Sequence, residues 1–220
     1  MVQYFTFECQ NRGYEEYIMK IGIDFDNTIV CYHEIFYKIA LEKNLIPAAI
    51  PVNKTAVRDY LRNIGKNDFW TELQGYVYGK RMSEAKIFEG VKEFLYDLKS
   101  NNISFVIISH KTKYPYKGPE YDLHQQAKNW LTYHGFFDQN QIGMKEEQVF
   151  FKLTKQDKLL CIAKNKCTHF IDDLPEFLTE KQFPQQVKPV LFDPDNNYSN
   201  INIVKFAYWK DIFLYFKSLI

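Results

Sequence analysis

The chain has 220 residues, of which 46% are hydrophobic and 25% are charged, and these proportions are ordinary for a globular protein with one sizeable core. Its formal net charge of +1 gives no reason to expect a nucleic-acid or membrane surface, so we expect neither partner. No stretch has the roughly 18 uninterrupted apolar residues of a membrane span, and no signal peptide is visible. The four cysteines lack the spacing of a disulfide framework, and we therefore expect a reduced, cytoplasmic protein.

The stretch from Lys20 to Val30 carries the first candidate site. It opens as a short apolar run typical of a buried parallel strand, and then places Asp24 and Asp26 one residue apart, with Thr28 two residues further on. On a continuing strand the two carboxylates would share a face, and like charges that close need a cation or a shared proton. A Mg²⁺ ion held by carboxylate and carbonyl oxygens is the obvious candidate, and a polar turn that closes the strand is the alternative.

The flanking segments differ in character. Residues 1–18 show no clear periodicity, and we expect them to be an N-terminal extension. Helices are predicted over 32–44, over 53–63 with Asn53 as cap, and from about 67 to 75 or beyond. A connection of this length is too long for an ordinary loop, so we expect a helical insertion.

From residue 91 onward, predicted helices and strands alternate. We expect helices over 91–100, 121–134, 154–165 and 206–220, and strands over 103–108, 148–151, 168–171 and 187–192. Such alternation argues for a parallel sheet with right-handed crossovers. We therefore predict an α/β fold: a Rossmann-like parallel sheet core with flanking helices, and a small, mainly helical unit inserted between the first and second core strands.

Polar side chains follow the predicted strands where each one ends. Asp24 and Asp26 follow the first strand, Ser109 follows the second, and Asp172 and Asp173 follow the fourth, with several lysines before it. In open parallel α/β sheets, ligands bind beyond the carboxyl ends of the strands. The sequence therefore predicts one polar site at this edge of the sheet.

In this order the polar residues resemble the motifs of the haloacid dehalogenase superfamily. Asp24-Phe25-Asp26-Asn27-Thr28 resembles its first motif, Asp-x-Asp-x-Thr, with Asn27 where Gly is common. Ser109 in Val-Ile-Ile-Ser-His looks like the second motif, and Asp172-Asp173 in Phe-Ile-Asp-Asp-Leu-Pro-Glu looks like the fourth. The third motif is a lysine near the start of the helix before the fourth. Lys158 fits it best, and Lys152 is the runner-up.

The resemblance implies both domain limits and chemistry. The core would comprise residues 19–31 and 87–220, and residues 32–86 would form a helical cap. Phosphoryl transfer would pass through an aspartyl-phosphate at Asp24, with Asp26 as general acid and base. Mg²⁺ would be the cofactor, held by Asp24, Asp26 through its backbone carbonyl, Asp172 and Asp173, and Thr28, Ser109 and Lys158 would bind phosphate.

These motifs favour a small-molecule phosphatase, with a weak preference for a sugar phosphate as substrate. A phosphomutase or phosphotransferase, a nucleotidase and a non-catalytic binding protein stay open as alternatives, because a fold does not fix a function. Candidates for substrate specificity are His110, Lys111 and Lys113 after the second motif, and Arg81 in the insertion. Arg58 and Arg62, one helical turn apart, are either an anion clamp or a solvated helix face. The sequence gives no indication of an oligomeric state.

Overall fold

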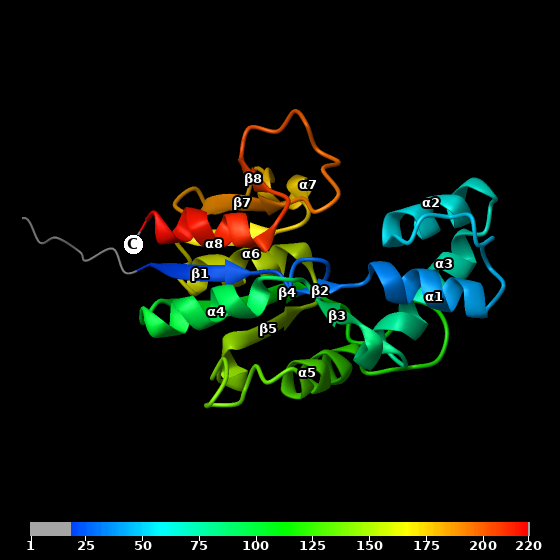
Figure 1. Ribbon diagram of the computed structural model, residues 1–220, viewed down its shortest axis with the longest axis horizontal. Helices are drawn as coiled ribbons and strands as arrows, with labels where there is room; N and C mark the ends of the chain where they lie inside the picture. The colour runs from blue at the N-terminus through cyan, green and yellow to red at the C-terminus, as the bar shows by residue number, and fades with distance from the viewer. Residues whose placement is uncertain (1–18, 220) are drawn as a thin grey trace, which may run out of the picture.

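A six-stranded, fully parallel sheet forms the centre of the computed structural model, which describes residues 19–219 (Figure 1). The expected extension over residues 1–18 lies outside the described residues. The strand order is β5-β4-β1-β6-β7-β8, which confirms the predicted α/β class. The strands are β1 (Lys20–Ile23), β4 (Ser104–His110), β5 (Val149–Lys152), β6 (His169–Asp172), β7 (Lys188–Phe192) and β8 (Val204–Phe206).

Helices cover both faces of the sheet because its inner strands are apolar on both sides. In β4, Phe105 and Ile107 pack into one cluster, which also holds apolar residues of α4 (Val91–Ser100), α5 (Leu123–Tyr133) and α8 (Trp209–Lys217). The alternate residues Val106 and Ile108 pack on the other face with α6 (Lys155–Lys164) and α7 (Pro175–Leu178). The period-two alternation along the strand thus produces a three-layer core.

Three further helices lie together beyond the end of the sheet at which β1 leaves it (Figure 1). They are α1 (His33–Glu42), α2 (Lys54–Asn63) and α3 (Asn67–Tyr78), and they come between β1 and β4 in sequence. The α2 helix begins as predicted, since the Asn53 side chain accepts hydrogen bonds from the backbone N–H groups of Thr55 and Ala56 at 2.7 and 3.2 Å. Aromatic side chains join the group, with the Phe36 and Trp70 rings 5.0 Å apart.

Short elements complete the described chain. A two-stranded antiparallel ribbon, β2 (Val30–Cys31) with β3 (Lys86–Ile87), joins the α1–α3 group to the core. Two 3-10 turns, η1 (Met82–Glu84) and η2 (Glu146–Gln148), lie before β3 and β5. Within residues 19–219, no helix has the length and apolar character needed to cross a membrane.

The C-terminal region differs from the predicted helix over 206–220. Val204–Phe206 forms β8, which pairs in parallel with β7, and α8 begins only at Trp209. The backbone N–H of Asp193 donates to the Phe206 carbonyl at 2.8 Å, so Phe206 continues the sheet rather than starting a helix. A three-residue strand is too short for its periodicity to be recognised, and the aromatic residues around it suit a strand or a helix equally.

A matched pair of substitutions tests the packing of α8 on the core. The Ile212 side chain is 0% exposed and that of Leu214 is 59% exposed. Ile212→Ala should lower the free energy of unfolding by about 2–5 kcal/mol, because it removes buried methyl groups and leaves a cavity. Leu214→Ala should change it by less than about 0.5 kcal/mol. Denaturant unfolding measures both, and equal losses would contradict the observed orientation of α8.

Candidate active site

The carboxyl ends of three neighbouring strands bring the predicted site residues together. Asp24 follows β1 directly, Ser109 is the penultimate residue of β4, and Asp172 is the last residue of β6. The backbone N–H of Asp24 donates to the Ile171 carbonyl at 2.8 Å, which fixes the start of the loop to the sheet. Carboxylate oxygens of Asp24, Asp172 and Asp173 all lie within 4.8 Å of one another.

A tight turn after β1 sets the direction of the first motif. The backbone N–H groups of Ile29 and Val30 both donate to the Phe25 carbonyl, at 3.1 and 3.0 Å. Asn27 has a φ of 61°, in the left-handed region that Asn tolerates better than most residues, which explains how it replaces the Gly common in the resembled motif. Thr28 is fully buried, and its carbonyl accepts a hydrogen bond from the Trp209 indole at 3.0 Å.

Lys158 lies between two of the carboxylates. Its Nζ donates to Asp24 Oδ1 and to Asp172 Oδ2, each at 2.6 Å. The helix start that places it was predicted, since the Thr154 side chain caps α6 by accepting from the Asp157 N–H at 3.0 Å. Lys152, the alternative for the third motif, has its amine over the Phe150 ring at 5.5 Å. The structure therefore places Lys158 beside the first and fourth motifs.

The carboxylate cluster carries more negative charge than Lys158 offsets. Burial, together with Asp172 nearby, raises the pKa of Asp24 to about 7 despite the Lys158 ammonium. Burial and then the Asp172 and Asp24 charges raise the pKa of Asp173 well above its ordinary value. Both shifts mean that a proton or a further cation must offset the negative charge of the cluster. Three converging carboxylates are the hard oxygen donors that suit a divalent ion such as Mg²⁺, so the residues fit a metal site.

Asp26 belongs to a separate group of contacts. Lys111 Nζ donates to both of its carboxylate oxygens, at 3.0 and 2.8 Å, and the Tyr32 hydroxyl donates to Oδ1 at 2.5 Å. Burial opposes ionisation, but the Lys111 charge and these hydrogen bonds outweigh it and lower the pKa of Asp26. The Lys111 amine also lies 4.7 Å from the centre of the Tyr78 ring in α3. Lys111, predicted as a specificity residue, therefore contacts the second aspartate of the first motif.

The other specificity candidates contact groups outside the carboxylate cluster. His110 Nε2 lies 3.1 Å from the Leu153 carbonyl, and the Lys113 amine is 3.9 Å from an Asp122 carboxylate oxygen at the surface. The Arg81 guanidinium forms ion pairs with Glu42 and Glu84. Of the four residues proposed from the sequence, only Lys111 has a hydrogen bond to a motif aspartate among the described contacts.

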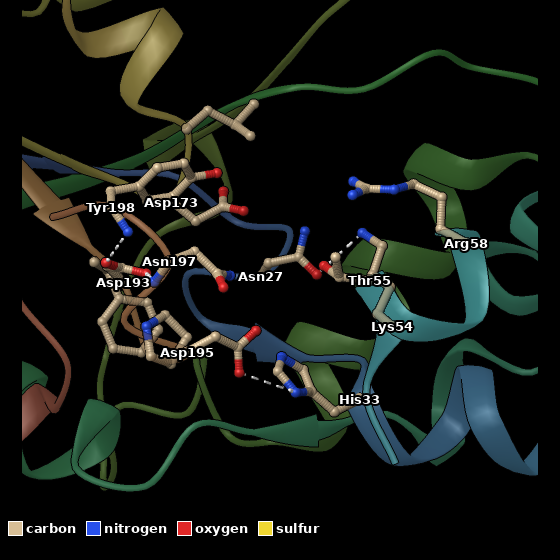
Figure 2. Close-up of a pocket in the computed structure, with 13 residues that line it drawn as sticks. Asn27, His33, Lys54, Thr55, Arg58, Asp173, Asp193, Asp195, Asn197 and Tyr198 are labelled. Carbon is tan, nitrogen blue, oxygen red and sulfur yellow. Dashed lines mark hydrogen bonds and ion pairs between the residues drawn. The ribbon is translucent and has the colours of Figure 1, made fainter. Parts of the chain in front are cut away.

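Lys54, in the α1–α3 insertion, was not among the residues expected at the site, whereas Arg58 was one of two arginines considered as an anion clamp. Lys54 Nζ donates to Asn27 Oδ1 at 3.0 Å, and with Arg58 it lines a cavity of roughly 160 Å³ beside Asp173 (Figure 2). Burial lowers the pKa of Lys54. The predicted Asn53 cap was the one available signal, since it fixes where α2 begins. That signal does not say which core loop the first turn of the helix faces.

No family model and no curated protein matches the chain, whereas many solved structures do. A haloacid dehalogenase superfamily hydrolase from Ehrlichia chaffeensis is 14% identical, with a TM-score of 0.54 over 91% of this chain and 96% of that one. A predicted phosphoglycolate phosphatase from Haemophilus somnus is 16% identical, with a TM-score of 0.54 over 92% and 99%. A haloacid dehalogenase family hydrolase from Deinococcus radiodurans, with bound phosphate and sodium, is 12% identical, with a TM-score of 0.54 over 88% and 92%. At these identities the likeness establishes the fold.

The contacts of Lys158 predict a large stability difference between two neighbouring lysines. Lys158→Met should lower the free energy of unfolding by about 3–5 kcal/mol in metal-free buffer, because it leaves two buried carboxylates without their common partner. Lys155→Met, on the exposed side of the same helix, should change it by less than about 0.5 kcal/mol. Denaturant unfolding with EDTA compares the two variants. Equal midpoints would contradict the central position of Lys158.

Proposed function

We propose that this chain, whose fold is that of the haloacid dehalogenase superfamily hydrolases, is a Mg²⁺-dependent phosphatase of small phosphomonoesters. The observation that carries the proposal is the convergence of Asp24, Asp172 and Asp173 around Lys158 at the carboxyl edge of the sheet. This arrangement supplies a nucleophile, a metal-binding set and a phosphate-binding cation within one site. Asp26, on the same loop as Asp24, supplies the acid–base group.

In the first step, an Asp24 carboxylate oxygen bonds to phosphorus while the bond from phosphorus to the leaving oxygen breaks. The leaving oxygen takes its proton from Asp26, which must therefore enter this step as the acid. Lys111 and Tyr32 favour the carboxylate form of Asp26 in the free protein. The negative charge of a bound phosphoryl group acts in the opposite direction and favours protonation.

In the second step, water attacks phosphorus in the aspartyl-phosphate and releases inorganic phosphate, which restores the Asp24 carboxylate. Asp26, now ionised, removes the proton from the attacking water, and its two hydrogen bonds from Lys111 fix the orientation of the carboxylate for this role. Asp26 thus returns to its acid form for the next turnover.

Side chains around Asp24 would bind the phosphate group of the substrate. Lys158 is within hydrogen-bond distance of Asp24 and would donate to a phosphoryl oxygen, and the buried Ser109 hydroxyl would donate from the end of β4. Asp24, Asp172, Asp173 and the Asp26 carbonyl would hold the metal. A bound Mg²⁺ supplies positive charge that reduces the repulsion between the nucleophile and the phosphate.

The α1–α3 group would act as a cap over this site and exclude water during the reaction. It contacts the core loop that follows β4 at several points: Lys111 lies against Tyr78, Lys117 forms an ion pair with Asp68, and a Cβ at Gly75 would lie 2.7 Å from Pro115. These contacts connect the insertion to the lysine that binds Asp26.

Two proteins of similar fold support a phosphate ester as substrate. The Haemophilus somnus protein is a predicted phosphoglycolate phosphatase, and the Deinococcus radiodurans structure holds phosphate and sodium. The bound phosphate of the second structure supports the proposal that a site in this architecture receives a phosphate group.

Phosphate release from p-nitrophenyl phosphate tests the proposal. The wild-type protein should turn over this ester with Mg²⁺ and lose activity with EDTA. Asp24→Asn should lower the rate by at least about a thousandfold, because the amide is a poor nucleophile, whereas the exposed Asp138→Asn should retain the wild-type rate. A rate that is independent of metal and unaffected by Asp24→Asn would overturn the proposal.

A further inference from the structure

A small cavity opens beside the carboxylate cluster (Figure 2). Its walls come from the loop after β1, from the first turns of α2 and from the loop 193–198 after β7, and Asp173 lies on its wall. Its volume is roughly 160 Å³, equal to about five water molecules at ~30 Å³ each. A group bonded to the phosphoryl group at Asp24 would extend into this space.

Two cations face the cavity from one side of α2. Lys54 and Arg58 are four residues apart, so they lie on the same face of the helix. Lys54 Nζ has Asn27 as its hydrogen-bond acceptor, and no carboxylate pairs with it among the residues that the structure describes. Three aromatic rings lie 5.4–5.5 Å from this amine, those of Tyr32, Phe36 and Tyr78.

The Arg58 guanidinium is only partly used by protein contacts. Its Nε pairs with Asp59 at 2.8 Å, and within residues 19–219 its two terminal amino groups have no hydrogen-bond partner. The guanidinium points from α2 into the cavity, across from Asp173 and Tyr198 (Figure 2). Its planar pair of donors is therefore available for a bidentate contact with a carboxylate or a phosphate.

Two of the acidic residues on the opposite wall, Asp193 and Asp195, already have partners. Asp193 accepts two backbone N–H groups of its own loop, at 2.9 and 3.1 Å, and the Lys205 amine at 3.1 Å. Asp195 accepts the Asn53 amide at 2.9 Å. These contacts hold the loop 193–198 in place and join it to the start of α2. They leave Lys54 and Arg58 as the lysine and the arginine of the cavity that a substrate can engage.

We infer that Lys54 and Arg58 form the leaving-group subsite, and that the preferred substrates are small phosphomonoesters with a second acidic group, a carboxylate or a second phosphate. Lys54 would lie near the ester oxygen of the substrate, because Lys54 contacts Asn27 in the loop of the first motif. Arg58 lies one helical turn further along α2 and would bind the second acidic group. This inference rests on the proposed phosphatase function and names its substrate class. The sequence favoured a sugar phosphate as substrate. The inference adds that the sugar phosphate, or a smaller phosphate ester in its place, carries a second acidic group.

Pairs of esters that differ in one group provide the test. 3-Phosphoglycerate differs from glycerol 3-phosphate in having a carboxylate in place of a hydroxymethyl group. Propane-1,3-diol bisphosphate differs from its monophosphate in a second phosphate, so the two pairs distinguish the two acids. For at least one pair, the wild-type kcat/KM should be about tenfold or more higher for the more acidic member, as expected from a charge-assisted hydrogen bond.

Two arginines on α2 provide matched variants. Arg58→Gln should lower that acidic-to-neutral ratio of kcat/KM by about tenfold or more, because it removes the charge and one of the paired donors. Arg62→Gln, an exposed position one turn further along the helix, should keep the wild-type ratio. Thermal melting of both variants checks that they are folded.

The outcomes separate this inference from the proposed function. The inference is overturned if the acidic-to-neutral ratio of kcat/KM in the wild type is near one for both pairs, or if the two arginine variants have equal ratios. In either case p-nitrophenyl phosphate would still be hydrolysed, so the proposed function would stand. No phosphate release from any of these esters overturns the proposed function, and the inference that rests on it fails with it.

Discussion

The most demanding interaction in this structure is the approach of three carboxylates to one buried lysine at the end of the sheet. Removing several charges from water is costly unless opposite charges and hydrogen bonds compensate. Lys158 compensates for two of the carboxylates with 2.6 Å contacts, while burial and the neighbouring carboxylates still raise the pKa values of Asp24 and Asp173. A proton or a cation must offset this imbalance, and the three carboxylates fit a divalent ion. The rest of the fold holds these carboxylates close together although their negative charges repel one another.

Elements that are far apart in sequence combine to hold that site. Parallel pairing of β1 with β4 and β6 places the first, second and fourth motifs at one edge. Trp209, from the last helix, donates to the Thr28 carbonyl and supports the turn that follows Asp24. Lys111 joins Asp26 to α3 through the Tyr78 ring, so a movement of the α1–α3 group would alter the surroundings of Asp26.

The core and its charged edge were predictable because they depend on local patterns. Apolar runs ending in Asp24, Ser109 and Asp172 identify parallel strands, and the Thr154 cap fixes the start of α6, which places Lys158 rather than Lys152 at the site. The assignments that follow from packing between the insertion and the core were not predictable. Lys111 turned inward to Asp26, and β8 was too short to show a period.

The residues of the cavity illustrate the same limit. Lys54 lies on a polar helix whose sequence is equally suited to a solvated surface, and only the position of α2 against the loops after β1 and β7 brings it to the motif. For Arg58 and Arg62 the sequence left both an anion clamp and a solvated face open. The structure separates them: Arg58 lines the cavity, and Arg62 is exposed.

The central claim is that Asp24 becomes covalently phosphorylated, and trapping that intermediate tests it most directly. Acid quenching during turnover, followed by peptide mapping by mass spectrometry, should find the phosphoryl group on the peptide that contains Asp24. With p-nitrophenyl phosphate, whose phenolate leaves without being protonated, the amount should increase in Asp26→Asn, because only the second step then depends on Asp26, as its base. A phosphoryl group on another residue, or substrate turnover with no labelled protein in either form, would contradict the account.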